Sequence, residues 1–236
     1  MSATPTERLQ WVVSGPGADI GFGWKVDIDA AFVPAHDQEV FEAKPNARAD
    51  MTAGTLYALV GDGCWVYYGQ VTSEKKVGFF KRRDREAVAA ALVLTEAVMS
   101  VTSVGYPSIT RALRTGRWSK LGRFPMADEL IAPHPSVQWP VGTLTVTVWM
   151  GDEPDHDTRV EDPAIQDMEL MAVWDAVDHI PARLTADFGA EKAEWHVGGP
   201  IWRERRIKED MATRFDQSWY QLPGDWVPTT KRRLPI

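Results

Sequence analysis

The chain has 236 residues and a formal net charge of −7, and its composition excludes several classes of protein. Hydrophobic residues make up 44% and charged residues 25%, a globular balance that excludes a chain disordered throughout. The acidic charge weighs against a general nucleic-acid-binding protein. The single cysteine, Cys64, excludes an internal disulfide and a zinc site built from several cysteines.

No segment has the pattern of a membrane or export signal. The first ten residues are polar and lack the apolar stretch of a signal peptide. The longest apolar run, residues 87–94, is too short to cross a bilayer. We therefore expect a cytoplasmic protein that makes no contact with a membrane.

The first 50 residues are predicted to form a strand-rich arm and a linker, and residues 51–236 are predicted to form one domain. Residues 10–14 and 23–32 carry β-branched and aromatic side chains between glycines, which is typical of strands. Residues 33–51 are polar, contain two prolines and are interpreted as a linker.

The clearest strand pattern lies between residues 54 and 80. Three runs of β-branched and aromatic residues, 55–60, 64–71 and 76–80, are separated by turn residues. The pair Asp62-Gly63 between the first two runs predicts a hairpin. Gly69 inside the second run indicates a bulge or bend, such as small barrels use to close.

Further along the chain, a helix is predicted over residues 85–101, because Asp84 can cap it and alanine and leucine fill most of its circumference. A short helix is predicted to begin at Pro107 and to end before Gly116. Threonine alternates with apolar residues over 143–150, which predicts a half-buried strand.

Two helices are predicted in the C-terminal third. The first begins at Pro163 behind an Asp162 cap, since apolar residues recur every three positions up to residue 177, and Pro181 is expected to end or kink it. The second covers residues 201–215, and the proline-rich tail from Pro223 is predicted to be irregular. These segments together predict an α+β fold: a twisted, mostly antiparallel β-sheet that can curl toward a barrel, with helices packed on one side.

Charge is segregated along the sequence. Residues 152–178 hold ten acidic side chains and one arginine, which creates a negative potential able to steer a basic partner; the alternative is a solvated helix face and loop. Residues 111–123 hold five basic side chains and no acidic one. They predict either a phosphate site built on Arg111, Arg114 and Trp118, or a solvated edge or internal partner for the acidic block.

No motif in the sequence requires catalysis. The glycines of residues 15–23 are spaced G-x-G-x-x-x-G, which differs from the dinucleotide-binding pattern. The acidic segment 151–162 has Val160 where a calcium loop needs glycine, and it is interpreted as a flexible loop. Cys64 is interpreted as structural. We therefore predict a protein that is not an enzyme and has no catalytic residue, cofactor or metal site.

Two segments together resemble the immunity protein 26 family. Residues 53–80, AGTLYALVGDGCWVYYGQVTSEKKVGFF, resemble the opening of that family, which is a strand, a Gly-Asp-Gly turn and an aromatic strand. Residues 116–125, GRWSKLGRFP, resemble a second recurrent piece, and prolines then lead to another strand at 142–151. The resemblance covers about residues 53–180. The first 50 residues and the segment after Phe188 have no counterpart in it.

The resemblance implies an immunity protein of a bacterial polymorphic-toxin system. Such a protein neutralises a cognate toxin, which we expect to be basic, by stoichiometric occlusion. It implies steering by an acidic surface and anchoring by aromatic side chains, for which core packing is the alternative role. The residues assigned to steering are Asp152, Glu153, Asp155 and Asp157, and those assigned to anchoring are Trp149 and Trp174.

Two other classes of function stay open at this point. The chain could be a structural or assembly subunit of a larger particle, such as a phage or a secretion apparatus. It could also be a hydrolase with an unrecognised acidic or cysteine site, for which a pocket lined by Cys64, a histidine and carboxylates would be the sign. Homo-oligomerisation is compatible with either binding role, and a nucleic-acid partner is not expected.

Overall fold

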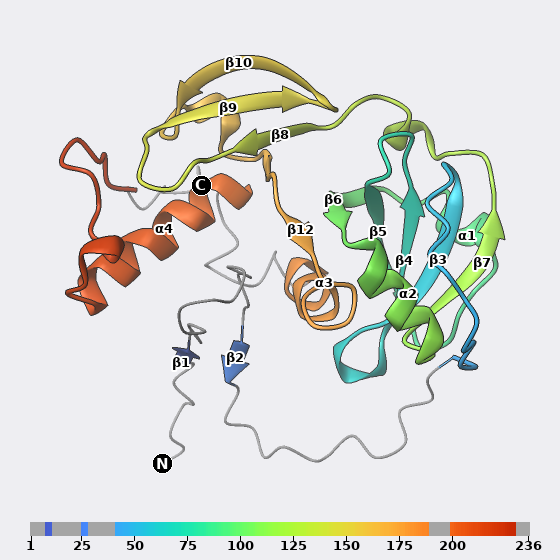
Figure 1. Ribbon diagram of the computed structural model, residues 1–236. Coiled ribbons are helices and arrows are strands. Elements are labelled where there is room, and N and C mark those ends of the chain that lie inside the picture. Colours follow the sequence, from blue (N-terminus) through green and yellow to red (C-terminus); the bar gives the residue numbers. More distant parts are fainter. Residues whose placement is uncertain (1–7, 11–24, 28–40, 189–198, 230–236) are drawn as a thin grey trace, which may run out of the picture. The chain divides into compact units, whose positions relative to one another are not determined.

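The computed structural model describes residues 8–10, 25–27, 41–188 and 199–229 (Figure 1). The chain divides into two compact units, Met1–Glu39 and Val40–Ile236. In the first unit, β1 (Arg8–Gln10) pairs antiparallel with β2 (Lys25–Asp27). These strands coincide in part with the two strands predicted there, and the rest of those predicted strands lies outside the described residues.

The second unit contains a six-stranded sheet, which we call the main sheet. Its order is β12-β6-β5-β4-β3-β7, and every pair is antiparallel except β12 with β6. The register shifts in three of the pairs, which increases the local twist, and the sheet curls as a half-barrel. The strands are β3 (Thr55–Val60), β4 (Val66–Val71), β5 (Val77–Asp84), β6 (Val98–Val104), β7 (Trp118–Arg123) and β12 (Val173–Trp174).

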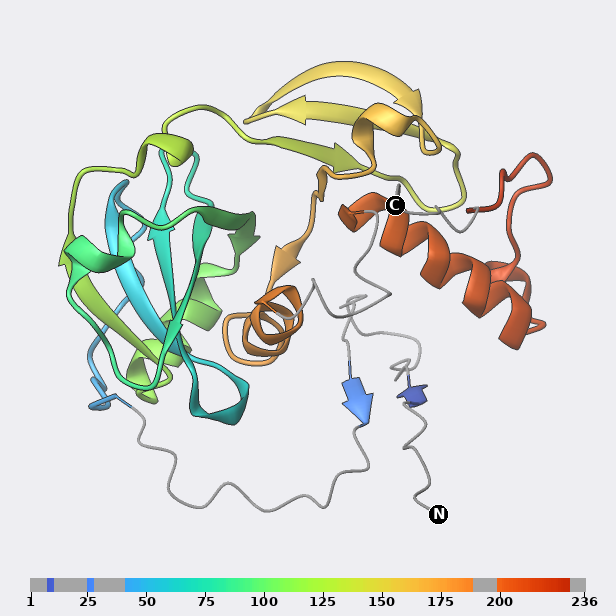
Figure 2. The ribbon, with the colours of Figure 1, turned by 180° about the vertical axis from the view of Figure 1, so that it is seen from behind.

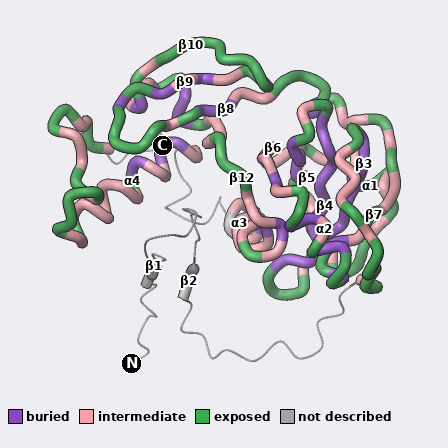
Figure 3. The backbone as a smooth tube through the Cα atoms, in the orientation of Figure 1, coloured by how far each residue is buried: buried purple, intermediate pink, exposed green. Residues whose placement is uncertain are grey.

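Both faces of the main sheet are covered by apolar side chains. On one face, α2 (Tyr106–Arg114) and α3 (Ile180–Phe188) pack against a core that includes Tyr57, Phe79 and Trp118. On the other face, the short α1 (Ala90–Val93) and neighbouring loops cover a second core. Because every residue of β3 and β4 is buried, these two strands form the centre of the unit, as Figure 3 shows.

A second, four-stranded sheet has the order β10-β9-β8-β11, and we call it the small sheet. Its strands are β8 (Pro135–Gln138), β9 (Thr145–Met150), β10 (Glu153–Arg159) and β11 (Glu169–Leu170). One face packs on a third core, to which Ile201 of α4 (Gly199–Arg214) contributes. Figure 2 shows the small sheet and α4 from behind. The outer strand β10 is exposed along almost its whole length.

Several sequence predictions are confirmed. The fold is α+β with a twisted, mostly antiparallel sheet, and helices α2 and α3 lie on one of its faces. The three strands predicted between residues 54 and 80 are present, as are the strand at 143–150 and the helices at 107–114 and 201–215, with shifted ends. Gly116 follows α2 with a φ of 72°, the left-handed conformation expected of a helix stop. Residues 223–229 are irregular, as predicted for the start of the tail.

The helix predicted over residues 85–101 is wrong. Strand β5 continues to Asp84, only residues 90–93 are helical, and β6 begins at Val98. Val98 lies opposite Phe80 of β5, so the valines near the end of the predicted helix are strand residues. Pairing with β5 thus overrides the helical preference of the alanine-rich run.

The helix predicted from Pro163 is also wrong beyond its first turn. Asp162 does cap it, because the Asp162 side chain accepts a hydrogen bond from the Ala164 N–H, but the helical turn ends at Ile165. The chain then extends to pair with β8 and later with β6. Pro181 lies in the first turn of α3, where proline is tolerated, so it begins a helix and does not end one.

The flexible loop predicted over residues 151–162 is wrong as well. Residues 153–159 form β10, which pairs with β9 through six residue pairs and a bulge after Pro154. The charged sequence hid this strand, because an outer strand with one solvated edge can carry polar side chains throughout.

Candidate functional site

The four acidic residues assigned to partner binding lie together on the hairpin formed by β9 and β10. Asp152 lies in the turn, beside Gly151 with its φ of 66°, and Glu153, Asp155 and Asp157 follow on β10. All four side chains are exposed. We call Asp152, Glu153, Asp155 and Asp157 the acidic hairpin.

The acidic hairpin differs from the neighbouring acids in its ion pairing. Within the described parts of the chain, none of its four carboxylates pairs with a lysine or arginine. Asp155 lies 2.8 Å from His156 Nδ1, and Asp157 accepts a hydrogen bond of 2.7 Å from the Thr147 hydroxyl. Four of the six acids that follow in the block are paired with arginines: Glu161 with Arg159, Glu169 with Arg183, and Asp175 and Asp178 with Arg111. The uncompensated negative charge of the block is thus greatest at the hairpin.

The two tryptophans assigned as anchors lie in different sheets. Trp149 is on β9, half-buried, and its indole N–H donates to Gln138 Oε1 over 3.2 Å. Trp174 is on β12, where it packs against the core under α3, with Arg183 4.5 Å above its ring. The structure therefore places Trp149 beside the acidic hairpin and gives Trp174 a packing role.

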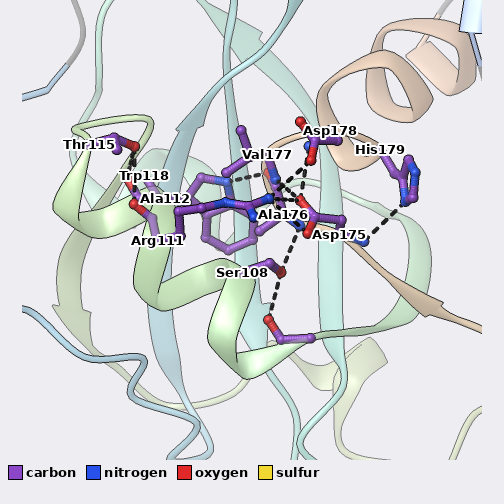
Figure 4. Close-up of polar contacts among 11 residues, drawn as sticks. Ser108, Arg111, Ala112, Thr115, Trp118, Asp175, Ala176, Val177, Asp178 and His179 are labelled. Carbon is purple, nitrogen blue, oxygen red and sulfur yellow. Dashed lines mark hydrogen bonds and ion pairs between the residues drawn. The ribbon is translucent and has the colours of Figure 1, made fainter. Parts of the chain in front are cut away.

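Arg111, the first residue of the basic stretch, is an internal partner of the acidic block. Figure 4 shows Arg111 on α2 directed at the turn before α3, where its guanidinium lies 2.9 Å from Asp175 and 3.0 Å from Asp178. Burial acts to raise the pKa of Asp175, but the N–H groups of Asp178 and Val177, together with Arg111, outweigh it and hold this pKa below its usual range. Of the alternatives that the sequence left open, the internal partner is confirmed for Arg111.

Ser108 of α2 lies beside Asp175 and His179 of the same turn, yet the hydrogen bonds of these residues are structural (Figure 4). The Ser108 hydroxyl donates to Gly105 O and accepts from the Ala176 N–H. His179 Nδ1 accepts from the Asp175 N–H over 3.3 Å, so His179 contacts the backbone of that aspartate. The arrangement lacks the hydrogen bond from serine to histidine that an acyl-transfer relay uses. It fixes the turn onto α2.

A cavity of about 660 Å³ is lined by β6, β11, α3 and the start of α4. A chain of ion pairs crosses one wall: Arg183 donates to both carboxylate oxygens of Glu169, over 3.0 and 2.5 Å, and also to Asp187, which in turn pairs with Arg203. Burial acts to lower the pKa of Arg183, and the charges of Glu169 and Asp187 outweigh it and raise this pKa. The sequence analysis missed this network, although an arginine four residues before an aspartate on a helix is a recognisable ion-pair signal.

A second cavity of about 280 Å³ adjoins the first, and the two share lining residues that include Val101, His134 and Glu169. Its other walls include Lys76, Thr102, Ser136, Trp149 and Asp152. Trp149 and Asp152 thus connect this cavity with the acidic hairpin. Cys64 is exposed and lines neither cavity.

Within the described ranges, no three histidine, cysteine or acidic side chains are grouped so that they could hold a metal ion. None of the helices in that part of the chain combines the length and apolar composition that a membrane span requires. Comparison with models of protein families, with curated proteins and with solved structures gives no match. The surface and the cavities are therefore the structural features that bear on function.

Proposed function

We propose that the chain is an immunity-type binding protein that neutralises a cognate bacterial toxin by stoichiometric occlusion. The observation that carries the proposal is the acidic hairpin: four exposed carboxylates, one in the turn and three on the outer strand β10, none paired with a lysine or arginine of the described chain. A basic partner supplies the positive charges that the described part of the chain does not place beside the hairpin. The resemblance to the immunity protein 26 family supports the same function.

The electrostatics of the hairpin act mainly on the rate of encounter. Complementary charge raises association rate constants from about 10⁵–10⁶ M⁻¹s⁻¹ to as much as about 10⁸–10⁹ M⁻¹s⁻¹ at low salt. Because the four carboxylates are exposed, they remain hydrated until the partner arrives and cost little to present. The hairpin thus accelerates binding, and the lifetime of the complex comes from apolar contacts.

Trp149 is the apolar residue best placed to supply such contacts. It lies on β9 opposite Pro154 of β10, and its ring is held by the bond to Gln138. A half-buried aromatic side chain beside a charged rim is the usual composition of a binding hot spot. The mechanism requires no bond to be made or broken, since a partner whose basic active-site surface is covered cannot reach its substrate.

The test uses the purified product of the toxin gene adjacent to the gene of this chain. The variant D152N/E153Q/D155N/D157N removes four negative charges and is expected to lower the association rate constant at least tenfold at low salt, with a smaller effect at 0.5 M salt. The matched control, E42Q/E86Q/D128N/D216N, removes four exposed acids elsewhere and is expected to change the rate less than threefold. Equal rates for the two variants, or a neighbouring gene product that the wild-type chain neither binds nor inhibits, would contradict the proposal.

A further inference from the structure

The smaller cavity, of about 280 Å³, is lined in part by polar groups that have no hydrogen-bond partner among the described residues. Thr102 of β6 is 1% exposed and Ser136 of β8 is 6% exposed, and the hydroxyl oxygens of both have no hydrogen-bond partner within the described chain. Most buried hydroxyl groups in proteins are hydrogen-bonded, because an unsatisfied one costs free energy. Two such groups lining the same cavity indicate that it is shaped for a polar ligand.

Strand register explains how these groups come to line one space. Across the small sheet, Ser136 lies opposite Trp149 on one side and Glu169 on the other, so these three side chains share a face. In the main sheet, Thr102 lies opposite Val77, next to Lys76. The cavity therefore lies between the face of the small sheet that carries Ser136, Trp149 and Glu169 and the end of the main sheet that carries Lys76 and Thr102.

Lys76 adds further donors to the same wall. It is 9% exposed, and its ammonium lies 3.1 Å from Glu74 Oε2 without the alignment of a hydrogen bond. An ammonium group has three N–H donors, so Lys76 can bond a ligand and keep its ion pair with Glu74. Lys76 lines the cavity and Glu74 does not, so the donor is the member of this pair that a ligand can reach.

The buried charges around the cavity are paired, and this pairing decides the class of ligand. Lys76 is neutralised by Glu74, and Glu169 is neutralised by Arg183. The remaining carboxylate, Asp152, is exposed and hence lies at the mouth in contact with water. A buried charged ligand would lack a counter-charge and would pay a large desolvation cost, whereas a neutral ligand would not.

We propose that this cavity binds a neutral, polyhydroxylated ligand the size of one sugar ring. Hydroxyl groups both donate and accept, as Thr102 and Ser136 require, and they can bond the Lys76 ammonium and the Asp152 carboxylate. The half-buried Trp149 ring supplies an apolar wall for the carbon face of such a ligand. The volume, near the lower limit of about 300 Å³ for small-molecule sites, suits a single ring better than an extended chain.

The test titrates the full chain with D-glucose, D-galactose, D-mannose, N-acetyl-D-glucosamine and myo-inositol, using saturation-transfer NMR and tryptophan fluorescence. At least one probe is expected to bind saturably below about 10 mM. Thr102→Val and Ser136→Ala each remove one hydroxyl with little change of shape, and each is expected to weaken binding about fivefold to tenfold. Without a probe, both variants are expected to be as stable as the wild type or more stable, because each loses an unsatisfied buried hydroxyl.

Thr55→Val is the matched control. The Thr55 hydroxyl is also buried without a partner but lines neither cavity, so its loss is expected to leave the binding of the probe unchanged. The proposal is overturned if none of the five probes binds, which would leave the cavity with ordered water only. It is also overturned if glucose 6-phosphate or an amino acid binds more tightly than every neutral probe, or if Thr55→Val weakens binding as much as Thr102→Val does.

Discussion

Replacing Arg183 by methionine tests whether the buried ion-pair network holds α3 against the small sheet. The Arg183 side chain is 9% exposed, and it bonds both oxygens of Glu169 and one oxygen of Asp187. Methionine keeps the apolar contact with Trp174 but leaves Glu169 without its only ion-pair partner in the described chain. Asp187 is less affected, because Arg203 still pairs with it.

The magnitude follows from this burial. Removing one partner of a buried ion pair costs about 3–5 kcal/mol, since the remaining charge is left unpaired in a poorly hydrated site. For a domain of this size, each kcal/mol lowers the melting temperature by about 2–4 °C, so the variant should melt roughly 6–20 °C below the wild type. Urea denaturation followed by circular dichroism gives the free energy of unfolding directly.

Two further variants decide whether the cost comes from the unpaired charge. Arg111→Met breaks a pair whose arginine side chain is 52% exposed, and it should cost less than about 1 kcal/mol. The double variant E169Q/R183M removes the unpaired carboxylate and should be at least about 1 kcal/mol more stable than R183M. The unpaired charge is not the cause if R183M lowers the free energy of unfolding by no more than Arg111→Met does, or if the double variant is no more stable than R183M.

Two more predictions concern local conformation and pH. Gly116 has a φ of 72°, and a Cβ there would lie 2.0 Å from Phe41 O, so Gly116→Ala should lower the free energy of unfolding by about 3 kcal/mol or more in denaturation experiments. Gly142 has a φ of 75° and open space around it, so Gly142→Ala should lower the free energy of unfolding by only about 1 kcal/mol. Asp175 has a folded-state pKa below its ordinary value of 3.8, so its stabilising effect is complete well above pH 3.8 and is lost as the pH falls through the folded-state pKa. The melting temperatures of the wild type and Asp175→Asn should therefore differ by a constant amount from pH 5 to 7 and converge below pH 4; a gap that widens on acidification would contradict this assignment.

The fold could be predicted where the chain contacts itself locally. Strands β3, β4 and β5 follow one another through short turns, so the runs of β-branched and aromatic residues and the Asp62-Gly63 turn were sufficient to indicate them. The two false helices fail for a common reason. Residues 98–104 form β6 because they pair with β5. Residues 169–174 contain β11, which pairs with β8, and β12, which pairs with β6. Such pairing with another strand is not encoded within the segment.

The candidate sites divide in the same way. The acidic residues of the hairpin could be recognised in the sequence, because a cluster of charge is evident without any knowledge of the fold. Their position on an outer strand could not be predicted from the sequence. The cavity linings bring together residues far apart in sequence, such as Lys76, Thr102 and Ser136, through the packing of two sheets. A single threonine or serine in a strand carries no sign of being unsatisfied, so only the structure could identify these hydroxyls.

The acidic hairpin and the smaller cavity share Trp149 and Asp152, so the two proposals make a joint prediction. A partner that binds the hairpin contacts the mouth of the cavity, and a ligand in the cavity contacts the ring that the partner would use. If the cavity ligand changes the affinity for the partner, the partner changes the affinity for the cavity ligand by the same factor. We expect a saturating neutral sugar to change the dissociation constant of the toxin complex at least threefold, as measured by calorimetry. Thr102→Val, which lies away from the hairpin, should abolish that change while leaving toxin binding without sugar as it is; an unchanged dissociation constant would show that the two surfaces act independently.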